Sequence, residues 1–261
     1  MDRTYWHKQT VEKPLFPDIL WSRPQNKRQA GKLLIVGGHA ESFAAVGEAY
    51  AAAESAGIGI TRVLLPDSLQ KTVGRVFRAG EYVPSTPSGS FSQKSLAELM
   101  DMSAWADGTL LAGDLGKNSE TAILLEKFIN KYDGALTLAG DAVDYFIGSP
   151  AQLLGRRDTV LVLSFEQLQK LAANARFTLA FTSQMDFLHL IEALHEFTKD
   201  NQTSIIIRRL EATFVAVNGQ VSSTKQAPSQ PDSLTKTAAQ ATVWLLQNTP
   251  KPFEALTTSL V

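Results

Sequence analysis

Cysteine is absent from the 261 residues of this sequence. Its absence excludes disulfide bridges, thiolate zinc sites and a cysteine nucleophile, and it is typical of proteins from a reducing compartment. We therefore expect a cytoplasmic protein. The sequence also lacks an apolar run approaching the roughly 18 residues that a membrane-spanning helix needs, and its start, MDRTYWHKQTVEKPLFP, has no apolar signal core. We expect no targeting segment and no membrane partner.

An excess of charge of one sign is also lacking, since 25 Lys and Arg residues face 26 Asp and Glu residues, for a net charge of -1. A protein with this balance has no broad positive field to attract duplex nucleic acid. Nucleic acid is therefore not an expected partner. With 44% apolar and 20% charged residues, the chain can bury a large core, and we predict one domain over residues 1–261.

Short apolar runs alternate with longer helical patterns from Lys32 onward. This alternation predicts an α/β protein with a doubly wound, mostly parallel sheet and helices on both faces. One late antiparallel piece is expected, because Asn218-Gly219 between two apolar runs is typical of a two-residue hairpin turn. The predicted strands are 32–38, 59–66, 108–116, 135–141, 159–164, 203–209 and 213–217, and the predicted helices are 42–56, 119–132, 165–173, 184–199 and 233–247.

Residues 1–30 fall outside this alternation. They contain Pro14, Pro17 and Pro24, which do not fit a long helix or a central strand. We expect this segment to be an arm that packs on the body of the protein or on a neighbouring subunit.

Two glycine turns lie at the ends of predicted strands, one at Gly37-Gly38 and one formed by Gly113, Asp114 and Gly116. In a doubly wound sheet, ligands bind beyond the carboxyl ends of the strands, and glycines there let the backbone approach a ligand closely. The alternative is that these glycines only permit tight turns. Backbone N–H groups at the second turn suit phosphate, but Asp114 repels phosphate unless a cation lies between them, so we favour a turn that does not bind phosphate.

Charged side chains lie near the ends of other predicted strands. Asp141 and Asp144 could face one side and hold Mg²⁺ through water, or they could be helix N-terminal acids that interact with the macrodipole. Arg208 and Arg209 end a buried strand. One of them could reach a nucleotide phosphate, or they could form a surface pair near Glu211.

Of the four histidines, only His39 lies in a predicted strand-end loop, where it could contact a ligand. His189 and His195 are six residues apart on one helical pattern, and this spacing does not bring two imidazoles to one metal. We interpret both as structural or surface residues.

Taken together, these motifs resemble those of the ADP/ATP-dependent NAD(P)H-hydrate dehydratases, a ribokinase-like family, over nearly the whole chain. The stretch 23–66 resembles the family's entry segment, with its Gly-Gly-Ser, its Tyr-x-Gly-Ala helix start and its Ala-Gly-x-Gly turn. His39 stands for the serine, and Ala44-Ala45 stands for Gly-Ala. The positions that match are Gly37, Gly38, Ala56, Gly57 and Gly59.

Two further segments carry the resemblance. AGDLG resembles the family's Gly-Pro-Gly-Leu-Gly, with Gly116 kept, Ala112 for the first glycine and Asp114 for the middle one. LAGDAVDYF resembles the segment that reads Asp-Ala-Asp-Ala-Leu-Asn, of which Asp141 keeps the second acid.

The diagnostic motifs of the family are altered. Thr-Pro-His-x-x-Glu becomes VLSFEQ, which places Ser164 at the histidine and Gln167 at the glutamate. In the family, a Gly-Thr-Gly-Asp motif begins a helix, and its Asp is the essential acid. In the alignment with this chain, Thr235 stands at the position of that Asp. A three-residue shift would offer Asp232 instead, and we prefer the alignment with Thr235.

The resemblance implies a three-layer α/β/α ribokinase-like fold, in which ADP or ATP with Mg²⁺ drives loss of water from hydrated NAD(P)H. It also implies a homo-oligomer, small-molecule nucleotides as partners, and last helices beyond the point where this sequence stops. By resemblance, the residues that contact the substrate are Gly38, His39, Ala45, Gly116 and Ser164. The residues that contact the nucleotide are Leu234 and the pair Arg208 and Arg209, which stands at the family's Lys-Gly. The catalytic candidates are Asp232 and Thr235, and the magnesium ligand is Asp141.

Three hypotheses follow. The chain is a divergent dehydratase that uses Asp232 or Asp141 as its acid, a catalytically inactive nucleotide-binding or assembly protein of the same fold, or a small-molecule kinase of the ribokinase-like group. The altered motifs favour the second hypothesis for this chain, because a missing general acid or base costs roughly 10²- to 10⁴-fold in rate.

Overall fold

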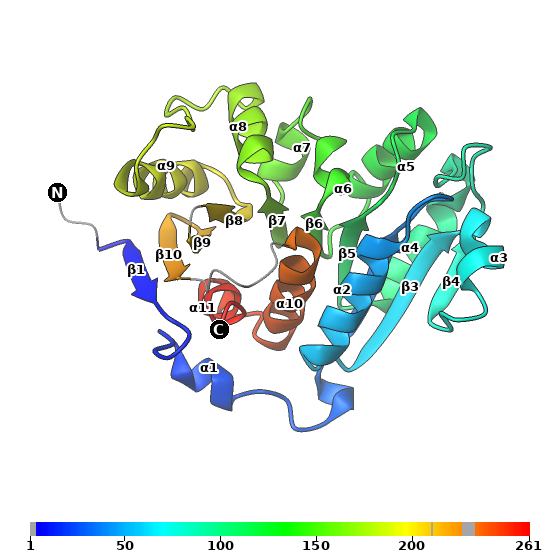
Figure 1. Cartoon of the computed structure of the whole chain (residues 1–261), viewed down its shortest axis with the longest axis horizontal. Helices are drawn as coiled ribbons and strands as arrows, with labels where there is room; N and C mark the ends of the chain where they lie inside the picture. The colour runs from blue at the N-terminus through cyan, green and yellow to red at the C-terminus, as the bar shows by residue number, and fades with distance from the viewer. Residues whose placement is uncertain (1–3, 210, 226–232) are drawn as a thin grey trace.

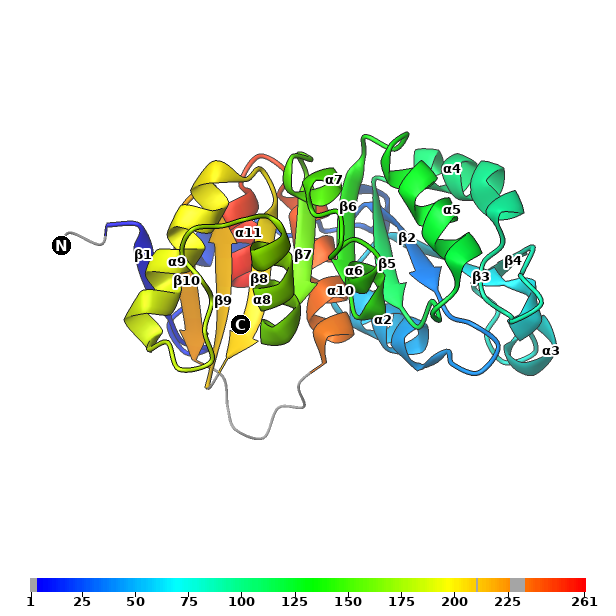
Figure 2. The same cartoon turned by 90° about the horizontal axis from the view of Figure 1, so that it is seen from above.

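The computed structural model describes residues 4–209, 211–225 and 233–261. In them, ten strands form one sheet in the order β1-β10-β9-β8-β7-β6-β5-β2-β3-β4 (Figure 1, with β2 labelled in Figure 2). Neighbouring strands run parallel, except that β9 pairs antiparallel with β8 and with β10. The strands are β1 (Trp6–Gln9), β2 (Lys32–Gly37), β3 (Ile60–Pro66), β4 (Gly80–Val83), β5 (Gly108–Gly113), β6 (Ala135–Ala139), β7 (Thr159–Leu163), β8 (Ser204–Arg209), β9 (Ala212–Val217) and β10 (Gln220–Lys225).

Helices cover both faces of this sheet (Figure 2). α2, α10 and α11 pack on one face, and α4, α5, α8 and α9 pack on the other. The predicted three-layer α/β/α fold is therefore confirmed. The helices are α1 (Pro17–Trp21), α2 (Ala44–Ser55), α3 (Gln70–Val73), α4 (Leu96–Trp105), α5 (Ser119–Ile129), α6 (Asp141–Asp144), α7 (Ala151–Leu154), α8 (Phe165–Asn174), α9 (Phe187–Asp200), α10 (Leu234–Gln247) and α11 (Pro252–Thr258). None of the helices in the described part of the chain has the length and apolar character needed to span a membrane.

The strands of the sheet centre are apolar on both sides because helices cover both sides. Successive residues of a strand point to opposite faces. In β2, Leu34 and Val36 therefore join the core under α4 and α5, whereas Leu33 and Ile35 join the core under α2 and α10. Burial on both faces explains why Leu33 to Val36 has no polar residue.

The predicted hairpin is confirmed. β9 and β10 pair antiparallel around Asn218 and Gly219, whose φ angles are 48° and 79°. Both angles are positive, as the favoured two-residue hairpin turn requires, and asparagine and glycine tolerate them best.

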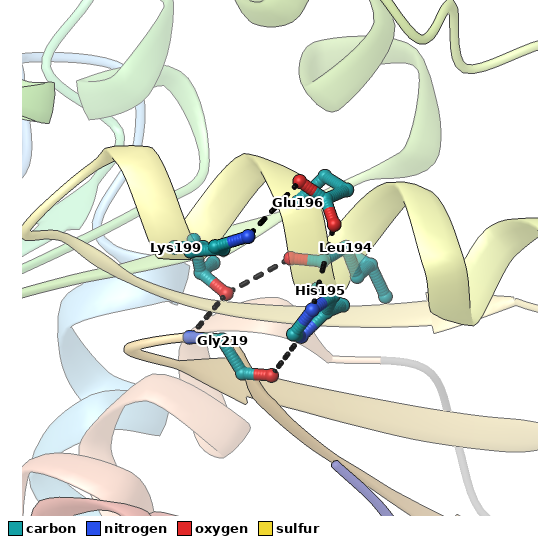
Figure 3. A network of polar contacts seen from close by, with 6 residues as sticks. Leu194, His195, Glu196, Lys199 and Gly219 are labelled. Atoms are coloured by element: carbon teal, nitrogen blue, oxygen red, sulfur yellow. Dashed lines mark hydrogen bonds and ion pairs between the residues drawn. The ribbon is translucent and has the colours of Figure 1, made fainter. Parts of the chain in front are cut away.

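Helix α9 holds this turn against the sheet (Figure 3). His195 Nδ1 donates a hydrogen bond to the Gly219 carbonyl, and the Gly219 N–H donates to Thr198 Oγ1 over 3.2 Å. Tyr5 stacks on the His195 ring with the ring centroids 3.7 Å apart. His195 thus joins the amino-terminal segment, α9 and the hairpin, in agreement with its interpretation as a structural residue.

The amino-terminal segment lies on the body of its own chain. β1 adds a parallel strand to the edge of the sheet, with Trp6 opposite Val221 of β10, and α1 contacts α11. The sequence pattern did not predict β1 or β4, because an edge strand of four residues has too little periodicity to stand out. Contact of this segment with a neighbouring subunit stays a prediction.

Candidate functional site at the carboxyl edge of the sheet

The direction in which the chain adds strands to the sheet reverses between β2 and β5. β3 and β4 lie on one side of β2, whereas β5 and β6 lie on its other side. In open α/β sheets, the crevice beyond the strand ends at such a point is where ligands bind. Gly37 and Gly38 follow β2, and Gly113 ends β5. A side chain at Gly37 would begin only 2.5 Å from the Gly113 carbonyl oxygen, and the Gly38 N–H donates to that oxygen over 3.1 Å. Glycine at position 37 is therefore required by the close approach of the two turns.

The Asp114 side chain caps the amino-terminal end of α2. Its φ of 56° turns the side chain back, and its Oδ2 accepts a hydrogen bond from the Ala45 N–H over 2.8 Å. Free N–H groups at a helix start attract anions, through the hydrogen bonds and through the helix dipole. The carboxylate of Asp114 thus occupies, from within the chain, the position at which α2 would hold an external anion.

His39 faces the same residue. Its Nδ1 lies 2.9 Å from the Asp114 carbonyl oxygen, and because a carbonyl only accepts, Nδ1 carries the proton. A side chain at Gly116 would begin 3.4 Å from the His39 ring and 2.7 Å from Ser90 Oγ. The structure therefore brings His39, Asp114 and Gly116 together, and it adds Ser90, which no motif indicated.

Asp141 begins α6 at the end of the neighbouring strand β6. Both carboxylate oxygens accept from the Leu115 N–H, at 3.0 and 3.3 Å. Burial raises the pKa of Asp141, the hydrogen bond from Leu115 opposes that rise, and the negative charge of Asp114 adds to it. The described residues contain no group of three His, Cys, Asp or Glu side chains able to hold a metal ion, and the Asp141 carboxylate is turned to the backbone. These donors do not by themselves fit Mg²⁺, and the magnesium role of Asp141 stays a prediction.

A cavity of about 410 Å³ opens beside Asp141. Asp144 and Tyr145 line it, together with the start of α5. Tyr145 donates its hydroxyl hydrogen to the Gly116 carbonyl, and burial raises the pKa of its hydroxyl. Sequence reasoning missed Tyr145. Its only signal was its position four residues after Asp141, one helical turn on.

Ser164 serves as the N-cap of α8. Its side chain accepts from the Gln167 N–H, while the Gln167 side chain accepts from the Ser164 N–H, so the two form a capping box. Gln167 Nε2 also donates to the Gly140 carbonyl and to Asp144, both over 2.8 Å. The two altered positions of the family's Thr-Pro-His-x-x-Glu motif thus tie α8 to the β6 turn.

Thr235 and Leu234 begin α10. Thr235 is buried and its Oγ1 donates to the Ala112 carbonyl over 3.3 Å, whereas Leu234 packs against the core. Ser233 caps the helix by accepting from the Lys236 N–H over 3.1 Å, and it donates to Glu48 of α2 over 2.6 Å. Asp232 lies outside the described residues.

The two arginines at the end of β8 point to different places. Arg209 donates to the Ser183 carbonyl over 2.6 Å and stacks over the Phe165 ring at 3.8 Å. Arg208 lines a cavity of about 150 Å³ with Ser233 and Lys236 at the start of α10.

The predicted site residues therefore form two groups. One group, near the turns after β2 and β5, contains Gly38, His39, Ala45, Gly116 and Asp141. The second group contains Arg208 and the start of α10.

A scan against protein-family models and a search of curated proteins found no match to this chain. Solved structures do resemble it. A ribokinase-like superfamily protein from Enterococcus faecalis has a TM-score of 0.73 at 15% identity, covering 99% of this chain and 86% of that one. The ADP/ATP-dependent NAD(P)H-hydrate dehydratase from Bacillus subtilis, co-crystallized with ATP/Mg²⁺, has a TM-score of 0.64 at 13% identity, covering 94% and 85%.

A phosphomethylpyrimidine kinase from Clostridium difficile also matches, with a TM-score of 0.53 at 7% identity, covering 88% of this chain and 96% of that one. A dehydratase and a kinase thus share this architecture, so the likeness does not choose between their reactions. What these comparisons establish is that the chain has a ribokinase-like fold.

Proposed function

We propose that this chain is a nucleotide-binding protein of ribokinase-like fold that does not turn over hydrated NAD(P)H or phosphorylate a small molecule. One observation carries the expected lack of turnover: the Asp114 carboxylate accepts from the Ala45 N–H over 2.8 Å. This carboxylate neutralises the start of α2 and repels any phosphorylated ligand that approaches the crevice. An anionic reaction intermediate would have to displace it.

The second support is the alignment that puts Thr235 where the family has its essential acid. Thr235 places a hydroxyl there, and that hydroxyl donates to Ala112. A hydroxyl with this partner is a poor general base, and the loss of a positioned acid or base costs roughly 10²- to 10⁴-fold. Turnover is therefore expected to be weak or absent.

Support for nucleotide binding comes from the cavity beside α10. Arg208 and Lys236 line it, and both are cations near a helix start. Its volume of about 150 Å³ suits a phosphate group better than a whole nucleotide, since ligand pockets span roughly 300–1,000 Å³. The base and ribose would extend over the neighbouring surface.

A divergent dehydratase is the second candidate function. The cavity of about 410 Å³ beside Asp141 and Tyr145 favours it, because a carboxyl with a raised pKa suits a general acid. In that case Asp141 would protonate the leaving hydroxyl of the hydrated ring.

The two candidates separate in one experiment. The purified chain is titrated by calorimetry with ADP, ATP and NADPH, each with Mg²⁺, and is then assayed for loss of hydrated NADPH with ADP or ATP. We expect heat from ADP or ATP and no turnover. Turnover above the protein-free rate that falls in Asp232→Ala or Asp141→Asn would contradict the proposal and support the dehydratase, whereas no heat from any nucleotide would refute nucleotide binding.

The variant Asp114→Gly tests the role of the internal carboxylate. Glycine accepts the φ of 56° and frees the Ala45 N–H, so the affinity for inorganic phosphate is expected to rise. The matched control is Asp158→Gly, because Asp158 also has a positive φ, of 50°, and precedes β7 at the opposite edge of the sheet. An equal change in both variants would show that charge alone, and not the start of α2, governs the binding.

A further inference from the structure

The cavity at the start of α10 has a wall that no sequence motif indicated. Besides Arg208, Ser233 and Lys236, its lining includes Val11 of the amino-terminal segment and Leu260, which follows α11. The segment that adds β1 to the edge of the sheet therefore also borders the cavity in which a nucleotide phosphate is proposed to bind.

Val11 lies in a tight turn between β1 and α1. The Lys13 N–H donates to the Thr10 carbonyl over 3.1 Å, and the Thr10 N–H donates to the Lys13 carbonyl over 3.4 Å. Val11 is 52% exposed and lines the cavity. A ligand that extends out of the cavity on this side would therefore cover part of the Val11 side chain.

Gln9 fixes this turn to the body of the protein. Its Nε2 donates to Thr224 of β10 and to the Thr257 carbonyl of α11, and its Oε1 accepts from the Leu15 N–H, beyond the turn, over 3.2 Å. The segment then runs past α11, which α1 contacts (Figure 1). The wall is thus in place before a ligand binds, so a ligand gains this contact without the cost of ordering the turn.

The apolar and the cationic residues of the lining come from different elements. The apolar residues are Val11 from the amino-terminal segment and Leu260 and Val261 from the residues after α11. The cations are Arg208 from β8 and Lys236 from α10. Phosphate pairs with arginine and lysine, whereas ligand pockets hold the apolar parts of a ligand against apolar side chains. The base of a nucleotide is therefore expected on the side of Val11.

We propose that the turn between Thr10 and Lys13 forms one wall of the nucleotide site, so that nucleotide binding and docking of the amino-terminal segment stabilise each other. The inference rests on the proposed binding of a nucleotide at this cavity. The coupling is reciprocal: the factor by which the docked segment raises the nucleotide affinity is also the factor by which the bound nucleotide favours docking.

Calorimetric titration with ATP and with inorganic tripolyphosphate, each with Mg²⁺, tests the wall. Tripolyphosphate has the phosphate chain of ATP without the base and ribose. Val11→Ser is expected to weaken ATP binding about three- to tenfold, the effect of losing part of an apolar contact, and to leave tripolyphosphate binding unchanged. Val76→Ser is the matched control, because Val76 is 83% exposed and precedes β4 at the opposite end of the strand order. It should change neither affinity.

Trypsin cleavage after Lys8 measures docking of the segment. Lys8 has an exposed side chain but belongs to β1, so cleavage after it requires β1 to leave the sheet edge. Saturating ATP is expected to slow this cleavage in wild type and in Val76→Ser, and to slow it by a smaller factor in Val11→Ser.

The outcomes separate this inference from the proposed function. If ATP binds wild type and Val11→Ser equally and slows cleavage after Lys8 equally in both, the coupling is refuted while nucleotide binding stands. An equal loss of ATP and tripolyphosphate affinity in Val11→Ser would also overturn the wall. No heat from ATP or from tripolyphosphate with wild type would refute nucleotide binding itself, and the coupling with it.

Discussion

At the scale of one residue, Thr235 shows how the side chain at the start of a helix limits the chemistry available there. The resemblance aligns it with the family's essential acid, but in the structure its hydroxyl donates to the Ala112 carbonyl and only 8% of the residue is exposed. A carboxylate at this position would bring its oxygens against a carbonyl oxygen. The surroundings of Thr235 therefore suit a side chain that donates a hydrogen bond.

Restoring the acid by Thr235→Asp is expected to destabilise the protein by several kcal/mol, because the buried carboxylate would lack a donor. The free energy of unfolding in urea measures this loss. Thr237→Asp, on the half-buried side of the same helix, is the control and should cost much less. If Thr235→Asp proved as stable as the control, the site would still accommodate an acid.

Asp141 is expected to make stability depend on pH. Its pKa is raised above the ordinary 3.8, mainly by burial, so the folded chain holds this proton more tightly than the unfolded chain. Its contribution to the free energy of unfolding therefore falls as the pH rises from 3.8 through the folded pKa. Asp141→Asn removes this dependence and keeps an oxygen for the Leu115 N–H.

The measurement is urea unfolding of wild type and Asp141→Asn over a pH series. The stability of the variant relative to wild type should rise with pH across that window and then stay constant. Asp144→Asn, at an exposed position of the same short helix, is the control. A difference that does not vary with pH would mean that the Asp141 carboxyl has the same pKa in both states.

At the scale of elements, Gln9 connects strand β1 to strand β10 and helix α11. It is 4% exposed, and its Nε2 donates to Thr224 of β10 over 2.8 Å and to the Thr257 carbonyl of α11 over 2.6 Å. Gln9→Ala should lower the free energy of unfolding by about 1–3 kcal/mol, since it leaves buried groups unpaired.

Limited proteolysis gives a second measurement of the same change, because the amino-terminal segment should be cleaved earlier in Gln9→Ala than in wild type. The exposed Glu12→Ala is the matched control. Equal cleavage of both variants would mean that the aromatic contacts of Tyr5 and Trp6, and not Gln9, hold β1 in place.

Helix α8 depends on its cap. Ser164→Ala should cost about 1 kcal/mol, the ordinary effect of losing an N-cap oxygen, and Ser164→Asp should restore most of it, since aspartate caps as well as serine. Chemical denaturation of both variants checks this. A large loss of ligand affinity in Ser164→Ala without a loss of stability would instead support the substrate contact that the resemblance implies.

The whole molecule is expected to unfold as one unit. The sheet runs without a break from β1 to β4, and α10 contacts β5, β6 and β7 across its centre. Unfolding curves followed by tryptophan fluorescence and by circular dichroism should therefore coincide. Two separate transitions would contradict the prediction of one domain over residues 1–261.

The elements with long apolar patterns could be predicted, and the short ones could not. The helix predicted at 165–173 is observed at Phe165–Asn174 and the strand predicted at 32–38 is observed at Lys32–Gly37, because burial on both faces leaves a continuous apolar run. Helix α4 was missed. It follows an irregular loop, and its buried Leu99, Met102 and Ser103 give a weak helical stripe.

The candidate site could be located but not understood from its motifs. The glycine turns of β2 and β5 mark the right edge of the sheet, since ligand edges follow from strand direction. The bond from Asp114 to Ala45 joins residues 69 positions apart, and no local pattern encodes it.

The sequence by itself determined the fold class, the hairpin and the edge at which the turns gather, because hydrophobic periodicity and glycine chemistry act over a few residues. The tertiary structure alone decided which side chains satisfy one another. Whether Asp114 faces solvent, a ligand or the start of α2 depends on how two turns from distant segments meet, and hydrogen bonds require that geometry to within a few tenths of an ångström.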